Sequence, residues 1–180
     1  MQPHPSEDEV VFDWNRLEKN GPLTVKNVEL FDESLRDGIQ SPSAIDPPLE
    51  KKLEILHLIE SLGIEGADVG LPGAGPRAYA DVLAMVQEVS KHRMKVKVAC
   101  AGRTVVADIR PMVEISQKTG VPIEVYTFIG SSPIRQYAEE WDVDALLKKS
   151  EEAISFAVKE GLAVSYVTED TTRSSPRTLD

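Results

Sequence analysis

A chain of 180 residues, 41% of them hydrophobic, is long enough to bury a substantial core and lies in the usual range for one domain. Its 30 acidic and 20 basic residues give a formal net charge of −10, which disfavours nucleic acid and anionic membrane surfaces as partners. The single cysteine excludes an internal disulfide, and no apolar run approaches the roughly 18 residues of a membrane span. We therefore expect a soluble, cytoplasmic protein.

Residues 1–26 are polar and include an acidic run, so we expect a solvated N-terminal arm before a domain of residues 27–180. From residue 28 onward, short apolar runs alternate with longer helical patterns, which predicts repeated βα units and a parallel sheet. Five strands are expected, at residues 28–31, directly after Gly63, and at residues 95–100, 122–130 and 163–167.

Four helices are expected between these strands. The first begins with Asp46 as a cap, and it buries a face formed by Leu53, Leu56, Ile59 and Leu62. The second spans about residues 76–92, the third ends at Gly120, and the fourth is capped by Asp142 and ends at Gly161.

Polar side chains collect where the predicted strands end. In parallel α/β folds the functional site lies beyond the carboxyl ends of the strands, because the loops converge there. The residues at these positions are Asp32, Arg36, Asp37 and Gln40 after the first strand, Asp68 and Gly70 after the second, Arg103 after the third, Ser131, Ser132 and Arg135 after the fourth, and Glu169, Asp170 and Arg173 after the fifth. Their clustering predicts a shared site.

Each of these features also has a purely structural interpretation. Arg36 and Asp37 could form an ordinary loop ion pair, and Glu169 with Asp170 could cap the next turn. The run GLPGAGP after the second strand favours a turn over a phosphate-binding nest. Cys100 at the end of a buried strand is expected in the core, and no two histidines lie at a spacing typical of metal ligands.

Two segments, FDESLRDGIQ at residues 31–40 and VTEDTTRSSP at residues 167–176, resemble signatures of the DRE-TIM superfamily. This superfamily contains metal-dependent acyl-CoA condensing enzymes, among them the isopropylmalate, homocitrate and citramalate synthases, and also the hydroxymethylglutaryl-CoA lyases. A weaker similarity includes ACAGR at residues 99–103 and SSPI at residues 131–134. The resemblance implies a TIM (β/α)₈ barrel, here truncated to about five βα units.

Carried over position by position, the resemblance implies a Claisen-type condensation of acetyl-CoA with a 2-oxo acid. Asp37 would be the ligand of a divalent metal cation, which would be magnesium, manganese or zinc. Arg36 would stabilise charge on substrate oxygens, and Glu169 would be the acidic catalytic member. Asp32 would brace the loop. Substrate-binding roles fall to Gln40, Asp68, Arg103, Ser132, Arg135 and Arg173.

Two positions depart from the family pattern. Asp68 stands where the family commonly has a longer glutamate after the second strand. After the fourth strand the family often has a serine followed by histidine and lysine, whereas Ser132 is followed here by Pro133, Ile134 and Arg135. The Asp68 carboxylate would reach less far than that of a glutamate, the second departure concerns the acyl-group pocket, and both leave the particular 2-oxo acid open.

A complete (β/α)₈ barrel typically needs about 250 residues, and the family's two metal-binding histidines, spaced H-x-H, have no counterpart here. We therefore expect a truncated product or one piece of a split enzyme, inactive or nearly so unless a second copy or a complementing chain completes the barrel. Three alternatives remain: a lyase or aldolase type of carbon–carbon cleavage, a five-stranded flavodoxin-like binding domain, and a non-catalytic remnant that acts through a partner.

Overall fold

Five parallel strands form the framework of the computed structural model, which describes residues 27–174 and 176–179. The expected N-terminal arm, residues 1–26, lies outside the described residues. The strands are β1 (Phe31–Asp32), β2 (Gly66–Asp68), β3 (Lys97–Arg103), β4 (Ile123–Gly130) and β5 (Ala163–Glu169). They pair in the order β1-β2-β3-β4-β5, with every pair parallel.

This sequential order decides between the two expected folds. A flavodoxin-like sheet has the strand order 2-1-3-4-5, so that alternative is wrong. Sequential parallel strands separated by helices are the arrangement of a TIM barrel, and the described residues supply five of its βα units. The expected α/β fold, a partial TIM barrel, is confirmed.

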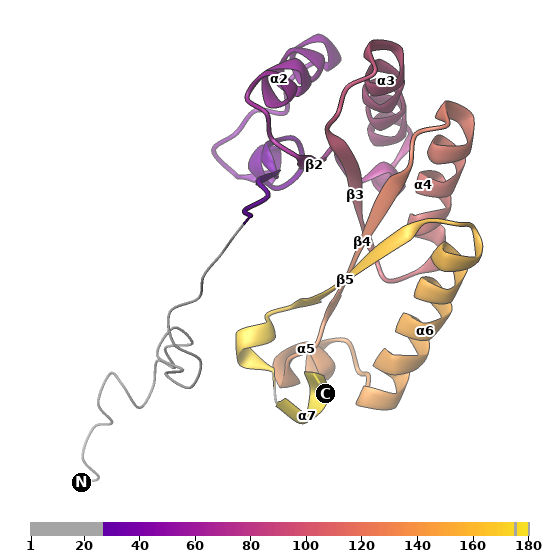
Figure 1. The fold of residues 1–180 in the computed structure, drawn as a ribbon. Coiled ribbons are helices and arrows are strands. Elements are labelled where there is room, and N and C mark those ends of the chain that lie inside the picture. The colour runs from indigo at the N-terminus through magenta and orange to yellow at the C-terminus, as the bar shows by residue number, and fades with distance from the viewer. Residues whose placement is uncertain (1–26, 175, 180) are drawn as a thin grey trace, which may run out of the picture.

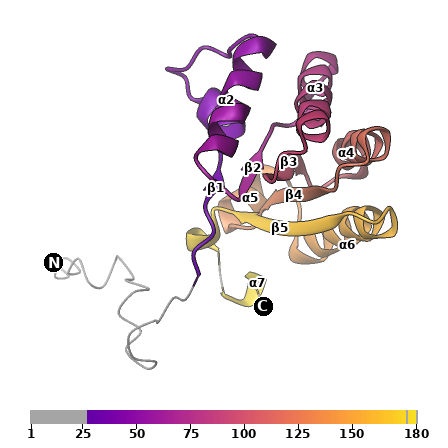
Figure 2. The same cartoon turned by 45° about the horizontal axis from the view of Figure 1, so that its top comes forward.

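Four long helices cover one face of the sheet. They are α2 (Leu49–Ser61), α3 (Pro76–His92), α4 (Val106–Thr119) and α6 (Val143–Lys159), and Figures 1 and 2 show them in a row beside the strands. Two short helices, α5 (Pro133–Ala138) and α7 (Pro176–Leu179), come after β4 and β5 in the chain, respectively. No helix within residues 27–174 or 176–179 combines the length and apolarity required to cross a bilayer.

Helix ends follow the local signals that the sequence carries. The predicted bounds of α3 are confirmed, and Asp142 caps α6 by accepting a hydrogen bond from the Ala145 N–H at 2.8 Å. Gly120 and Gly161 follow the ends of α4 and α6 with φ angles of 70° and 83°, a left-handed conformation that favours glycine.

The first expected helix needs correction. It begins at Leu49, after Pro48, and Asp46 does not cap it. The Asp46 carboxylate instead bridges Lys52 at 2.7 Å and Arg77 at 2.8 Å. Leu56 and Ile59 are buried and Leu53 packs partly against the core, whereas Leu62 lies beyond the helix end and is 75% exposed.

Two strands are also shifted from their expected bounds, because glutamate side chains compete for their N–H groups. The Lys95 and Val96 N–H groups donate to the Glu60 carboxylate at 2.9 and 3.0 Å, so β3 starts at Lys97 and continues to Arg103. Leu30 likewise donates to Glu65 at 2.7 Å, and β1 is shortened to Phe31–Asp32.

The core lies between the sheet and its helices. Val98, Cys100 and Val125 point from the strands into this layer, where Met85 of α3 and Met112 of α4 are also buried. Complete burial raises the pKa of the Cys100 thiol well above its ordinary value, so the thiol remains protonated and unreactive. The interpretation of Cys100 as a core residue is confirmed.

The opposite face of the sheet carries larger and more polar side chains. Glu124, Tyr126 and Phe128 alternate along β4 with the buried residues and remain partly accessible. Phe31 from β1 stacks on Tyr126 with ring centroids 5.1 Å apart, and it passes over Gly66, where a Cβ atom would lie 2.6 Å from the Phe31 ring. This face corresponds to the inside of a barrel.

The glycine-rich run after β2 is a turn with a packing role. It contains a 3₁₀ turn, Pro72–Ala74, and a Cβ atom on Gly73 would lie 2.9 Å from the Asp108 Cα of α4. We expect Gly73→Ala to lower the free energy of unfolding by about 1–3 kcal/mol, since backbone must shift to admit the methyl group. Gly38→Ala is the control, because its methyl group would meet its nearest neighbour at 3.6 Å. Urea titrations of the two variants with equal midpoints would contradict this account.

Candidate active site at the carboxyl ends of the strands

A π-helical turn, Ser34–Gly38, follows β1 directly and carries the signature arginine. The Asp32 carboxylate accepts hydrogen bonds from the Ser34 N–H at 2.9 Å and from the Ser34 hydroxyl at 3.1 Å. Leu35 is 1% exposed and anchors the turn in the core. These contacts fix the direction in which Arg36 leaves the turn and support the bracing role expected for Asp32.

Arg36 connects three strands at this end of the sheet. Its Nε lies 3.9 Å from the Oδ2 of Asp68, the last residue of β2, and its guanidinium carbon lies 5.4 Å from the centre of the Phe128 ring on β4. A second guanidinium nitrogen pairs with the Asp37 carboxylate. The Arg36 Nε is buried and has no hydrogen-bond partner among the described residues, while the side chain as a whole is 18% exposed.

Asp68 is a buried carboxyl group, 1% exposed, beside this arginine. Burial raises its pKa from 3.8 to about 7, and the charge of Glu33 acts in the same direction. A hydrogen bond from the Gly70 N–H at 2.9 Å and the charge of Arg36 oppose the rise in pKa. A carboxyl group with a pKa near neutrality can both accept and donate a proton under physiological conditions.

Glu33 is a member of this cluster that the sequence did not single out. Burial raises the pKa of Glu33 above its ordinary value, and its Oε2 atom is buried without a hydrogen-bond partner among the described residues. It lies inside the signature segment between Asp32 and Ser34, so its position was visible, but its inward orientation was not.

A second group of predicted residues lies around the ends of β3, β4 and β5. Arg103, Arg135 and Glu169 line one hollow of about 350 Å³, in which an Arg135 nitrogen lies 3.7 Å from a Glu169 oxygen. Phe128 also lines this hollow, and its ring lies beneath Arg36. Phe128 therefore connects the two groups, although the sequence analysis did not select it.

Ser132 has a structural task at this end of the sheet. It is fully buried, its hydroxyl bonds to the Asp170 carboxylate, and its Oγ caps α5 by accepting the Arg135 N–H at 3.3 Å. The Ser131 and Ser132 N–H groups also donate to Asp170 at 3.3 Å. Asp170 thus ties the end of β5 to the end of β4 and positions the short helix that carries Arg135.

The remaining predicted residues lie at the margins of the candidate site. Gln40 is exposed and lines, with Arg36, a separate pocket of about 390 Å³ between the turn after β1 and the start of α3. Arg103 is 69% exposed and its guanidinium is bound at 2.8 and 2.9 Å by Asp108 of α4. Arg173 is exposed at the end of the turn Thr171–Arg173.

Asp37, the predicted metal ligand, is 61% exposed and pairs with Arg36. Within residues 27–174 and 176–179, the one cluster of three possible metal ligands joins α2 to α3 and lies away from this site. Catalytic metal sites normally use about three protein ligands. The described residues at the strand ends therefore do not fit a complete metal site.

The sequential parallel sheet, with a polar cluster beyond its carboxyl ends, defines a domain of the TIM-barrel type, here five βα units of it. The profile of the HMGL-like family matches residues 27–180, and the chain belongs to this family. The resemblance to the DRE-TIM superfamily is thereby confirmed.

Three curated relatives of this chain are named as synthases. The chain is 31% identical over 86% of its length to a 2-isopropylmalate synthase from Lactococcus lactis subsp. cremoris (strain SK11), and 31% identical over 83% to one from Sulfurisphaera tokodaii. It is 28% identical over 86% of its length to homocitrate synthase AksA from Methanocaldococcus jannaschii. The matched regions span 29%, 36% and 36% of these relatives, about a third of their length.

A solved structure supports the fold alone. The crystal structure of a beta-arabinopyranosidase superimposes on 84% of this chain and 25% of that protein, with a TM-score of 0.51 and 12% sequence identity. At this identity the similarity concerns the arrangement of strands and helices only.

Proposed function

We propose that this chain supplies catalytic residues for a Claisen-type condensation, in which the acetyl group of acetyl-CoA is joined to a 2-oxo acid. The observation that carries the proposal is the position of Arg36. Its Nε, which has no hydrogen-bond partner among the described residues, lies beside the buried Asp68, and its guanidinium lies over Phe128. The synthase names of the relatives support the same reaction class.

The condensation requires a base, a group that stabilises negative charge on oxygen and a proton donor, and these residue types can provide all three. A base removes a proton from the acetyl methyl group, the resulting enolate carbon attacks the 2-oxo carbonyl carbon, and the new alkoxide takes up a proton. Water then cleaves the thioester and releases free CoA. Arg36 would stabilise the negative charge that develops on oxygen, while Asp68, with a pKa near 7, and Glu169 are the candidates for proton transfer.

Substrate recognition would fall to the residues around these three. Arg135 and Arg103 offer positive charge to a carboxylate or to CoA phosphates, and Gln40 and Arg173 lie at the margin of the site. Ser132 would contribute indirectly, because it caps α5 and thereby positions Arg135. Asp37 remains our proposed ligand for a divalent cation, with the other ligands coming from outside the described residues.

We also propose that further βα units, beyond the five that the described residues form, complete the barrel. In support of this, no strand among the described residues pairs with the outer edge of β5, and Tyr166 and Val167 on its two faces are 39% and 40% exposed. Uncovered edges of parallel sheets are prone to association.

The proposal predicts release of free CoA from acetyl-CoA and a 2-oxo acid. The chain would be assayed by thiol detection, alone and co-expressed with the part of the Lactococcus lactis synthase that follows its matched region. A panel of 2-oxo acids with branched, acidic and short side chains would show which one is used. We expect CoA release that depends on a 2-oxo acid and on the added fragment. Thioester hydrolysis that is indifferent to every 2-oxo acid would contradict the proposal.

A further inference from the structure

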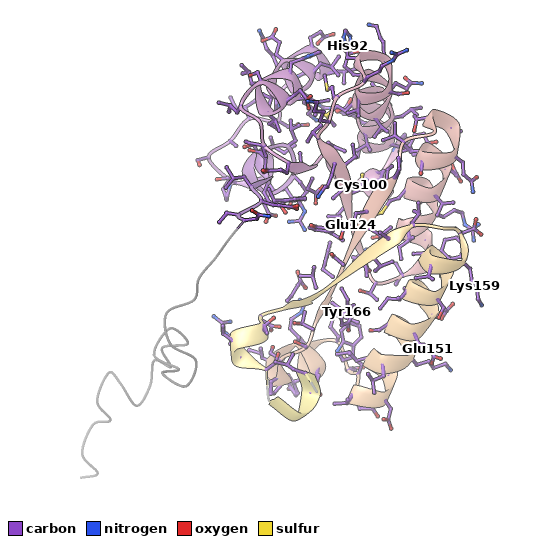
Figure 3. All side chains as sticks on the ribbon, in the orientation of Figure 1. His92, Cys100, Glu124, Glu151, Lys159 and Tyr166 are labelled. Atoms are coloured by element: carbon purple, nitrogen blue, oxygen red, sulfur yellow. The ribbon has the colours of Figure 1, made fainter. Side chains whose placement is uncertain are left out.

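Two histidines and a glutamate from neighbouring helices meet far from the candidate active site. The His57 Nε2 on α2 lies 2.9 Å from the Glu88 Oε1 on α3, and the His92 Nε2 lies 3.0 Å from the same oxygen. All three ligand atoms lie within 4.8 Å of one another. Figure 3 shows His92 at the end of α3 that lies away from α5 and α7.

The spacing of these atoms is close to that of a metal site. In a tetrahedral zinc site with bonds of about 2.0–2.1 Å, two ligand atoms lie about 3.3 Å apart. The imidazole nitrogens are 2.9 and 3.0 Å from the carboxylate oxygen, a few tenths of an ångström short of this spacing, and the two nitrogens lie within 4.8 Å of each other. The rings already meet edge to face, with centroids 5.1 Å apart.

The helices hold these side chains in a suitable orientation. Glu88 and His92 are four residues apart on α3, which places them on one face of the helix, and His57 faces them from α2. Glu88 is 17% exposed, while the two histidines are 45% and 44% exposed, so the site can be reached from solvent. Lys91 contacts the other Glu88 oxygen at 3.6 Å and leaves the shared oxygen free for a metal.

We propose that His57, Glu88 and His92 bind a zinc ion or a similar divalent transition metal and thereby clamp α2 to α3. Imidazole with carboxylate is a ligand set that suits zinc, copper and nickel, and three protein ligands leave a fourth position for water. The site is separate from Asp37 and does not rest on the proposed condensation.

Zinc binding to the full 180-residue chain tests the proposal, with equilibrium dialysis against zinc as the measurement. We expect one equivalent of zinc to bind, and each of His57→Gln, Glu88→Gln and His92→Gln to weaken binding by at least about 10-fold. Zinc at about 100 times its dissociation constant should raise the melting temperature by about 5–10 °C, and this rise should vanish in the three variants. Circular dichroism would verify that the variants are folded.

Two controls separate this site from other sources of zinc affinity. Glu54→Gln alters an exposed glutamate of α2 that pairs with Lys51, and His4→Gln removes the third histidine of the chain. Both controls should bind zinc as the wild type does. The proposal is overturned if zinc does not bind, or if affinity survives the His57 and His92 substitutions, or if it is lost in a control.

Discussion

Arg36→Ala should lower kcat for CoA release by about 10²- to 10³-fold, the usual effect of removing one donor that stabilises a developing oxyanion. The melting temperature should change little, because the Arg36 Nε has no hydrogen-bond partner among the described residues and its contact with Asp68 is long, at 3.9 Å. Steady-state thiol detection and a thermal melt of the same preparation measure the two effects together.

Arg110→Ala is the matched control for this experiment. Arg110 is an exposed arginine on α4 that lies over the Phe156 ring at 5.1 Å, in the helical layer away from the strand ends. It should retain the wild-type rate. Equal rates for wild type and Arg36→Ala would remove Arg36 from the mechanism.

Asp68→Asn should make the protein more stable at neutral pH. In the folded chain the pKa of Asp68 is raised from 3.8 to about 7, so between these values the folded state holds a proton that the unfolded state has lost. Stability therefore decreases as the pH rises through this interval, by up to about 4 kcal/mol from this residue. Asparagine remains neutral, and its oxygen can still accept the Gly70 N–H, so this decrease should disappear.

The same substitution should lower CoA release by about 10²-fold or more, because asparagine cannot transfer a proton. A gain in stability with a loss of activity is the pattern expected of a residue kept for function at a cost to the fold. Urea titrations at pH 5 and pH 8 compare the two proteins. Parallel pH dependences would show that the Asp68 pKa is not raised in the folded chain.

Prediction from sequence succeeded where local signals decide the structure. The extent of α3 and the cap of α6 by Asp142 follow from residues adjacent to those ends. It failed where a distant side chain intervenes. The Glu60 carboxylate accepts hydrogen bonds from backbone N–H groups 35 and 36 residues away, and β3 therefore starts later than expected. No pattern within Lys95–Cys100 indicates these hydrogen bonds.

The residues of the candidate site also divide into those that local sequence signals predict and those that depend on contacts between distant residues. Arg36, Asp68 and Glu169 were selected because they follow strands, and parallel pairing brings those strand ends to one edge. Phe128 was missed because it lies within a strand. It belongs to the candidate site because the Arg36 guanidinium, from the turn after β1, lies over its ring. The shorter side chain of Asp68 was noted, but only its burial reveals the raised pKa.

The histidine cluster is a proximity that the spacing of histidines in the sequence does not predict. No two histidines are close in the sequence, but α2 and α3 pack together and bring His57 and His92 to the same oxygen of Glu88. The sequence does predict that Glu88 and His92 share a helix face, because they are four residues apart. The position of His57 beside them depends on the packing of α2 against α3, which the sequence pattern does not give.

The most direct test of the proposed reaction follows labelled carbon. Acetyl-CoA with both acetyl carbons labelled would be incubated with a 2-oxo acid, the chain and its complementing fragment, and the products would be analysed by mass spectrometry. The proposal predicts a hydroxy diacid that carries both labelled carbons through a new carbon–carbon bond, and it predicts that Arg36→Ala suppresses this product. Label that stays in the thioester or appears only as free acetate would contradict it.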